Sequence, residues 1–142
     1  MKRAICVHSH FYQPPRECPW TERVEVQPSA APFANWNLRI TDECYAANAR
    51  AAIQDGSGNV VELVNNYAYM SFNVGPTLLT WLAANSPETL LAMVEADKAS
   101  VARCGGHGNA IAQVYNHAIM PLAHDRDKKT QVVWGKAVFE QF

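Results

Sequence analysis

The fold is indicated first by the stretch AICVHSH, residues 4–10. Its first four residues form a continuous apolar run, which is typical of a strand buried on both faces of a parallel sheet. Polar residues follow at once, so His8 and His10 are expected at the carboxyl end of a strand over residues 4–7. Because side chains two residues apart point to the same side of an extended backbone, the two imidazoles are expected to face the same way.

Strand and helix patterns alternate along the rest of the chain. Short segments rich in β-branched or aromatic residues predict two further strands, over residues 67–72 and 109–114. N-capping residues, prolines at first helical positions and apolar spacing predict helices over residues 41–54, 77–84, 87–103 and 127–142. Residues 11–40 have no clear period and are expected to form a long functional loop. This alternation predicts an α/β fold with parallel strands.

Length and composition favour one compact piece. The 142 residues suit a single domain, and a hydrophobic fraction of 49% is enough to bury a core. A formal net charge of -1 provides no field that would attract nucleic acid or an anionic membrane, so neither is an expected partner. No apolar stretch reaches the length of a membrane helix or of a signal-peptide core, and we expect a soluble, cytoplasmic protein.

The chain ends on Phe142, a large apolar residue that closes a helical pattern without a capping residue or a polar tail. Natural domains usually end in a loosely held polar segment. We therefore expect residues 1–142 to be a single piece that is truncated at its C-terminus, with an unfinished sheet and a tendency to self-associate.

Two groups of residues could carry chemistry. The first is the pair His8 and His10, and two functions remain open for it: chelation of a metal, or hydrogen bonding to sugar hydroxyls. The second group surrounds the third predicted strand and consists of His107, Asn109, Asn116 and His117. Its glycines allow a ligand to approach the backbone, but the Lys and Ser or Thr of a phosphate-binding loop are absent.

Aromatic residues gather in and beside the long loop: Tyr12, Trp20, Trp36 and Tyr45. Flat aromatic faces stack on the C–H faces of sugar rings, although the same residues could form a small core that holds the loop together. No arrangement typical of a serine or cysteine nucleophile is present, and the carboxylates are scattered. The four cysteines lack zinc-binding spacing and are expected to be reduced thiols.

Several blocks, in order along the chain, are similar to the N-terminal end of family 57 glycoside hydrolases, which are α-amylase and 4-α-glucanotransferase type enzymes. The first block is HSHFYQPPRE at residues 8–17, which is followed by NWN at residues 35–37 and ECY at residues 43–45. The next two are SFNVGPTLL at residues 71–79 and the segment 106–122, which contains HAIMP. The similarity covers nearly the whole chain.

This resemblance implies part of an incomplete (β/α)7 barrel that acts on α-glucans with retention of configuration. It also implies that the catalytic Glu and Asp lie in later motifs, so this chain has no catalytic residue, no metal and no cofactor, and is expected to be inactive alone. The residues expected to line the sugar pocket are His8, His10, Gln13, Trp36, His107, Asn109 and His117.

Two alternatives remain open. His8 and His10 could be ligands in a metal-dependent hydrolase of the amidohydrolase or polysaccharide deacetylase type. The chain could instead be a non-catalytic carbohydrate-binding domain. Hydrolysis and glucan transfer are not distinguished by these residues.

Overall fold

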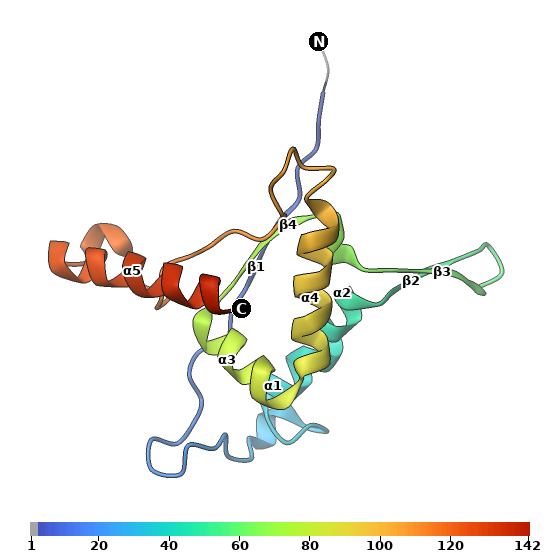
Figure 1. Cartoon of the computed structure of the whole chain (residues 1–142). Helices are drawn as coiled ribbons and strands as arrows, with labels where there is room; N and C mark the ends of the chain where they lie inside the picture. The colour runs from blue at the N-terminus through green and yellow to red at the C-terminus, as the bar shows by residue number, and fades with distance from the viewer. Residues whose placement is uncertain (1–2) are drawn as a thin grey trace.

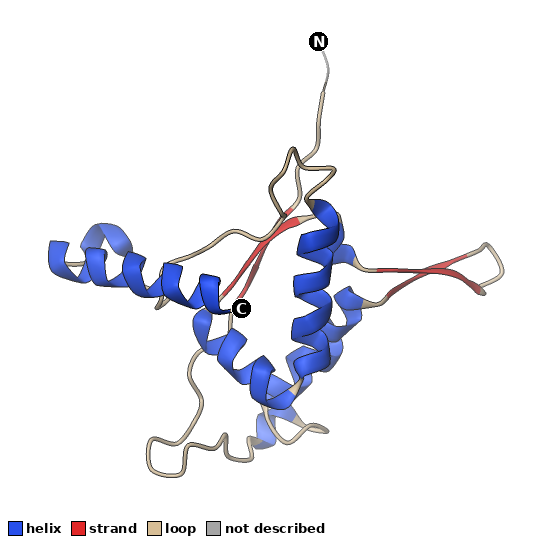
Figure 2. Ribbon diagram, viewed as in Figure 1, coloured by secondary structure: helices blue, strands red, loops and turns tan. Residues whose placement is uncertain are grey.

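The structure, a computed structural model, describes residues 3–142. Strand β1 (His8–Phe11) pairs in parallel with β4 (Ser71–Val74), and His8 lies opposite Ser71 and Phe11 opposite Val74. A third segment joins the other edge of β4 through a parallel bridge between Phe72 and Ala110. The chain is thus of mixed α/β type with a small parallel sheet, as the sequence predicts (Figures 1 and 2).

The first strand begins four residues later than predicted, so the expectation of a strand over residues 4–7 is wrong. Ile5 is 96% exposed and Val7 is 56% exposed, because helices cover only one face of this sheet. A strand on a half-covered sheet alternates between polar and apolar residues. In β1, Phe11 points to the core while His8 and His10 are exposed, so the polar run after residue 7 is the strand itself.

The other two predicted strands are also displaced. Residues Asn66–Ala68 form a 3-10 turn, η3, because the Asn65 side chain accepts a hydrogen bond from the Tyr67 amide at 3.1 Å. The strand β4 therefore starts only at Ser71. Of residues 109–114, only Ala110 pairs with β4, and the segment otherwise runs as a loop.

The helix predicted over residues 41–54 is wrong at both ends. Asn35 caps an earlier start by accepting a hydrogen bond from the Leu38 amide, and α1 (Trp36–Ile40) continues through a π-helical turn, η2 (Thr41–Ala46), into α2 (Ala47–Ala49). The chain then turns into β2 (Ala51–Gln54), which pairs antiparallel with β3 (Val60–Val64). This hairpin projects from the body of the protein (Figure 1).

Three predicted helices are confirmed. They are α3 (Pro76–Asn85), α4 (Pro87–Ser100) and α5 (Asp125–Gln141). Proline occupies an initial position of both α3 and α4. Backbone N–H groups in the first turn of a helix have no intrahelical acceptor, so proline, which lacks an N–H, costs no hydrogen bond there. Short 3-10 turns, η1 (Pro28–Ala30) and η4 (Met120–Leu122), interrupt the two long loops.

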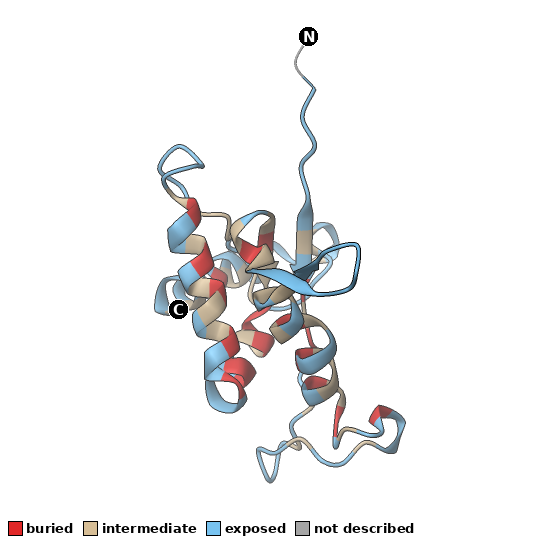
Figure 3. Ribbon diagram, turned by 90° about the vertical axis from the view of Figure 1, so that its right-hand side faces the viewer, coloured by how far each residue is buried: buried red, intermediate tan, exposed pale blue. Residues whose placement is uncertain are grey.

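The core lies between the sheet and helices α3 and α4. Its aromatic centre is formed by Phe11, Tyr67 and Phe72, which pack edge to face, and Leu78 and Leu82 of α3 are fully buried beside them. Figure 3 shows buried residues on the helices and an exposed hairpin. The opposite face of β1 and β4 is left open, and it carries His8 and His10.

Within residues 3–142, no helix combines the length and the apolar character that a membrane crossing requires. All four cysteines are free thiols, as expected.

Candidate functional site

The candidate site is a cluster of four side chains, His10, Tyr12, Asn73 and His117, on the open face of the sheet. His10 belongs to β1 and Asn73 is its register partner on β4. The Nδ1 atom of His10 lies 2.6 Å from the Oδ1 atom of Asn73. Because an amide oxygen only accepts, Nδ1 carries the hydrogen, and an imidazole in this tautomer has its lone pair at Nε2.

His117 reaches this cluster from the loop before α5. Its Nε2 atom lies 3.1 Å from Nε2 of His10, and the centre of its ring lies 4.4 Å from that of Tyr12. The loop is attached to α5, because Gln131 accepts the Tyr115 amide through its main chain at 3.1 Å and the Asn116 amide through its side chain at 2.6 Å. Helix α5 therefore positions His117 over the strand end.

Tyr12 lies where β1 leaves the sheet, and its ring is nearly parallel to that of His10, at an angle of 10° and a separation of 6.1 Å. Gly75 makes room for it, since a Cβ atom there would lie only 2.7 Å from Cδ2 of Tyr12. The absence of a side chain at the start of α3 thus allows the tyrosine ring to lie beside the two histidines.

His8 lies on the same face as His10, two positions earlier in the register. Its Nδ1 atom lies 2.8 Å from Oγ of Ser71. The face of the sheet thus presents two imidazoles, each supported by a hydroxyl or amide group from β4, and this agrees with the same-side arrangement that the sequence predicts.

Gln13 is turned into the protein, away from this face, and is only 7% exposed. Its amide donates to the Tyr45 hydroxyl at 2.9 Å, and its carbonyl accepts from Arg16 at 3.0 Å. Burial raises the pKa of Tyr45, and burial raises that of Tyr67 much further, so both phenols stay neutral. This buried network supports the end of β1 and holds the Gln13 side chain inside the protein, away from the open face of the sheet.

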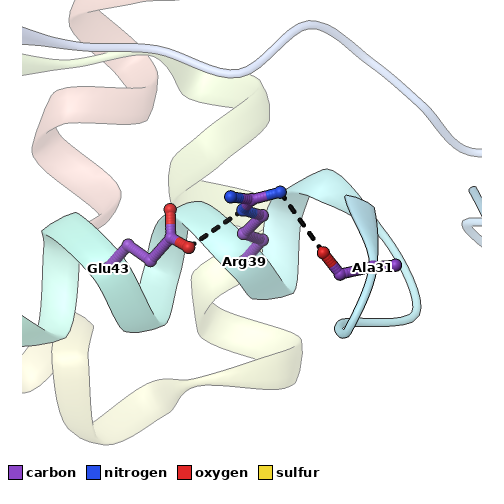
Figure 4. A network of polar contacts seen from close by, with 3 residues as sticks. All are labelled: Ala31, Arg39 and Glu43. Carbon is purple, nitrogen blue, oxygen red and sulfur yellow. Dashed lines mark hydrogen bonds and ion pairs between the residues drawn. The ribbon is translucent and has the colours of Figure 1, made fainter. Parts of the chain in front are cut away.

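Trp36 takes part in packing of the long loop. Its indole nitrogen donates to Ser29 Oγ at 3.0 Å, and the Arg39 guanidinium lies 5.0 Å from the centre of its ring. Arg39 in turn pairs with Glu43 at 2.9 Å and donates to the Ala31 carbonyl at 3.4 Å (Figure 4). One face of the indole is therefore covered by Arg39.

The remaining predicted residues lie after α4. His107 is exposed, and its side chain makes no hydrogen bond with any described residue. Asn109 supports the backbone: its amide donates to the carbonyls of Ala68 at 2.7 Å and Tyr67 at 3.1 Å. Of the seven predicted residues, the structure brings His10 and His117 into contact, places His8 beside them, and does not bring the other four to the cluster.

Two features of the cluster were not predicted from the sequence: the participation of Asn73 and the position of the Tyr12 ring beside the histidines. Asn73 was detectable only as a polar residue at the end of a predicted strand, the same type of position that singled out His10. No carboxylate in residues 3–142 forms a hydrogen bond or ion pair with the histidines of the cluster. The described residues also contain no group of three potential metal ligands.

Comparisons of the chain with family models, with curated proteins and with solved structures gave no match. The chemistry of the cluster is therefore argued from its own geometry. It offers a lone pair on His10, a hydrogen-bonding nitrogen on His117 and the face of a tyrosine ring, all at the carboxyl end of parallel strands.

Proposed function

We propose that this chain is the N-terminal portion of a retaining glycoside hydrolase or glucanotransferase of α-glucans, and that the cluster binds a sugar ring. The observation that carries the proposal is the contact of His10 and His117 beside Tyr12 on the exposed face of the sheet. It is supported by the resemblance of residues 8–17 and 106–122 to family 57 enzymes.

The chemistry of the cluster suits a neutral polyol. Sugar hydroxyls both donate and accept, and neutral imidazoles offer one group of each kind. An aromatic face adds dispersion contact with the C–H side of a sugar ring. A sugar hydroxyl that inserts between the two Nε2 atoms, 3.1 Å apart, would replace their direct contact by two hydrogen bonds.

The position of the cluster suits a barrel enzyme. In closed (β/α) barrels the strand face away from the helices lines the interior, and the active site lies at the carboxyl ends of the strands. His10 and Asn73 occupy this kind of position on β1 and β4. Retaining enzymes need two carboxyl groups about 5 to 5.5 Å apart, and we expect these from outside residues 1–142. The chain alone should release no reducing sugar from α-glucans.

The proposal is tested by calorimetric titration of the chain with maltopentaose, an α-1,4-linked oligosaccharide. Saturable binding is expected. His10→Ala and His117→Ala should each weaken it about tenfold, which corresponds to the loss of one or two hydrogen bonds. His124→Asn is the matched control, because it removes an exposed imidazole at the start of α5 and keeps a capping acceptor.

Two results would contradict the proposal. One is the absence of binding to maltopentaose and to longer α-glucans by the folded chain. The other is binding that His10→Ala and His117→Ala leave unchanged, since the sugar would then occupy a different surface.

A further inference from the structure

We propose that His10 and His117 form a two-histidine binding site for a late first-row transition-metal cation such as Co²⁺, Ni²⁺ or Zn²⁺. The site shares His10 with the pair His8 and His10 that the sequence suggested, but its second ligand is His117. It does not depend on the proposed carbohydrate function, because it rests on the positions of two ring nitrogens alone.

The distance between the two Nε2 atoms suits bidentate ligation. Zinc–imidazole bonds measure 2.0–2.1 Å, so two nitrogens on one tetrahedral cation are about 3.3 Å apart. The Nε2 atoms of His10 and His117 are 3.1 Å apart. For both to bind one cation, the rings must turn out of their direct contact, and His117 must carry its hydrogen on Nδ1 so that each Nε2 offers a lone pair.

The hydrogen bond behind His10 prepares it as a ligand. Metal-binding histidines almost always donate their second ring N–H to an oxygen, which orients the ring and makes the ligating nitrogen more basic. Asn73 accepts that hydrogen at 2.6 Å, so Nε2, the ligating nitrogen of His10, is the one that lies next to His117. Contact with the Tyr12 ring at 4.4 Å restricts His117 on the opposite side.

The site is open to solvent. His10 and His117 are both exposed, so a hydrated cation can approach without a conformational change. In residues 3–142 neither histidine has a carboxylate partner, and no third His, Cys, Asp or Glu joins them in a metal-binding group. Water molecules must therefore complete the coordination shell. Imidazole ligands favour Co²⁺, Ni²⁺ and Zn²⁺ over Mg²⁺ and Ca²⁺, which prefer oxygen.

The test is a titration of the chain, without an affinity tag, with Co²⁺, followed by its visible absorption. We expect a saturable cobalt spectrum that His10→Ala and His117→Ala each abolish. Asn73→Ala should weaken binding 10- to 100-fold by removing the hydrogen bond behind His10. His124→Asn, the matched control at an exposed histidine, should bind as the unaltered chain does.

A second measurement needs no variant. Paramagnetic Co²⁺ broadens NMR signals of nearby nuclei, so signals of Tyr12 and Asn73 should disappear before those of Asp55 in the distant hairpin. The proposal is overturned if Co²⁺ does not bind, if His10→Ala leaves the spectrum unchanged, or if sulfur-to-cobalt absorption shows a cysteine ligand. Because sugar is absent from every sample, failure here leaves the carbohydrate proposal unaffected.

Discussion

Gly135 is the residue through which α5 approaches the rest of the protein. It is the buried residue of that helix, and a Cβ atom at this position would lie 3.1 Å from the Tyr115 amide nitrogen and closer still to the Gln113 carbonyl oxygen. Contacts with backbone cannot be relieved by rotating a side chain. The close approach also supports the loop that carries His117.

Gly135→Ala is expected to separate α5 from this loop. Overpacking of this kind costs about 1–3 kcal/mol, which should appear in the free energy of unfolding by urea. The contact between Tyr115 and Trp134, now 5.3 Å between ring centres, should weaken and change the tryptophan fluorescence. Gly56→Ala is the matched control, since nothing lies within 4 Å of a Cβ atom there. Equal stability of the two variants would contradict this account.

At the scale of elements, the hairpin of β2 and β3 shows how turn chemistry overrides helix propensity. Residues 46–52 are rich in alanine and favour a helix. The turn that follows is closed by the Asp55 carboxylate, which accepts from the amides of Ser57 at 2.8 Å and Asn59 at 2.9 Å. Gly58 adopts a φ of 85°, which a side chain would disfavour. The turn thus reverses the chain and pairs residues that would otherwise extend α2.

The hydrogen bond from the Asn59 backbone, followed by that from its side chain, lowers the pKa of Asp55 below its ordinary value of 3.8. A carboxylate with a lowered pKa stabilises the folded turn above its unfolded pKa, and this contribution is lost as the pH falls through the folded pKa. We expect the exchange rate of the Asn59 amide, relative to the intrinsic rate of an unstructured peptide at the same pH, to rise in acid, and to rise at neutral pH in Asp55→Ala. Glu62→Gln, which removes another charge of the hairpin, should change neither rate.

The sequence predicts elements well where the signal is local. Proline at the start of α3 and of α4 and the breaks after them fix these helices without reference to the rest of the chain. The position of a strand depends on its partner. The start of β1 is set by its pairing with β4, which lies 63 residues later in the sequence, and β1 is therefore displaced from its predicted position. Residues 109–114 fail as a strand for the same reason.

The site follows the same division. The sequence singled out His10 and His117 as polar residues beside predicted strands, and the structure brings these two side chains together although both strands differ from the prediction. The roles of Gln13 and Asn109 could not be predicted, because a side-chain amide can form hydrogen bonds with any carbonyl, hydroxyl or guanidinium group that the tertiary fold brings near. The Gln13 amide forms hydrogen bonds with Tyr45 and Arg16, and the Asn109 amide donates to two carbonyls of η3.

At the scale of the whole molecule, apolar side chains remain exposed on two projecting elements. On α5 they include Val132, Val133 and Phe139, and on the hairpin Val61 and Leu63. A cavity of about 140 Å³ also lies between β4, α4 and the end of α5, and its lining is mostly apolar. Contiguous apolar surface of this kind promotes association.

We therefore expect the chain to self-associate at micromolar to millimolar concentration, as measured by sedimentation velocity. Val133→Lys should shift the distribution toward the monomer, because it places a charge on the apolar face of α5. Ala102→Lys adds the same charge at a small exposed residue outside α5 and should have less effect. A chain that stays monomeric throughout this range would contradict the expectation.

The parallel pairing of β1 with β4 also has a consequence for synthesis on the ribosome. His8 can pair only after Ser71, 63 residues later, has been synthesised. At 5–20 residues per second, synthesis of this segment takes roughly 3 to 13 s. Closing so long a segment costs about 2 kcal/mol more than closing the hairpin, so this pairing comes late. During the delay the nascent strand exposes mainly His8, Ser9 and His10, with Phe11 as its only large apolar residue. His10, which belongs to the site, and its polar neighbours thus keep the unpaired first strand compatible with water and limit its association with other chains.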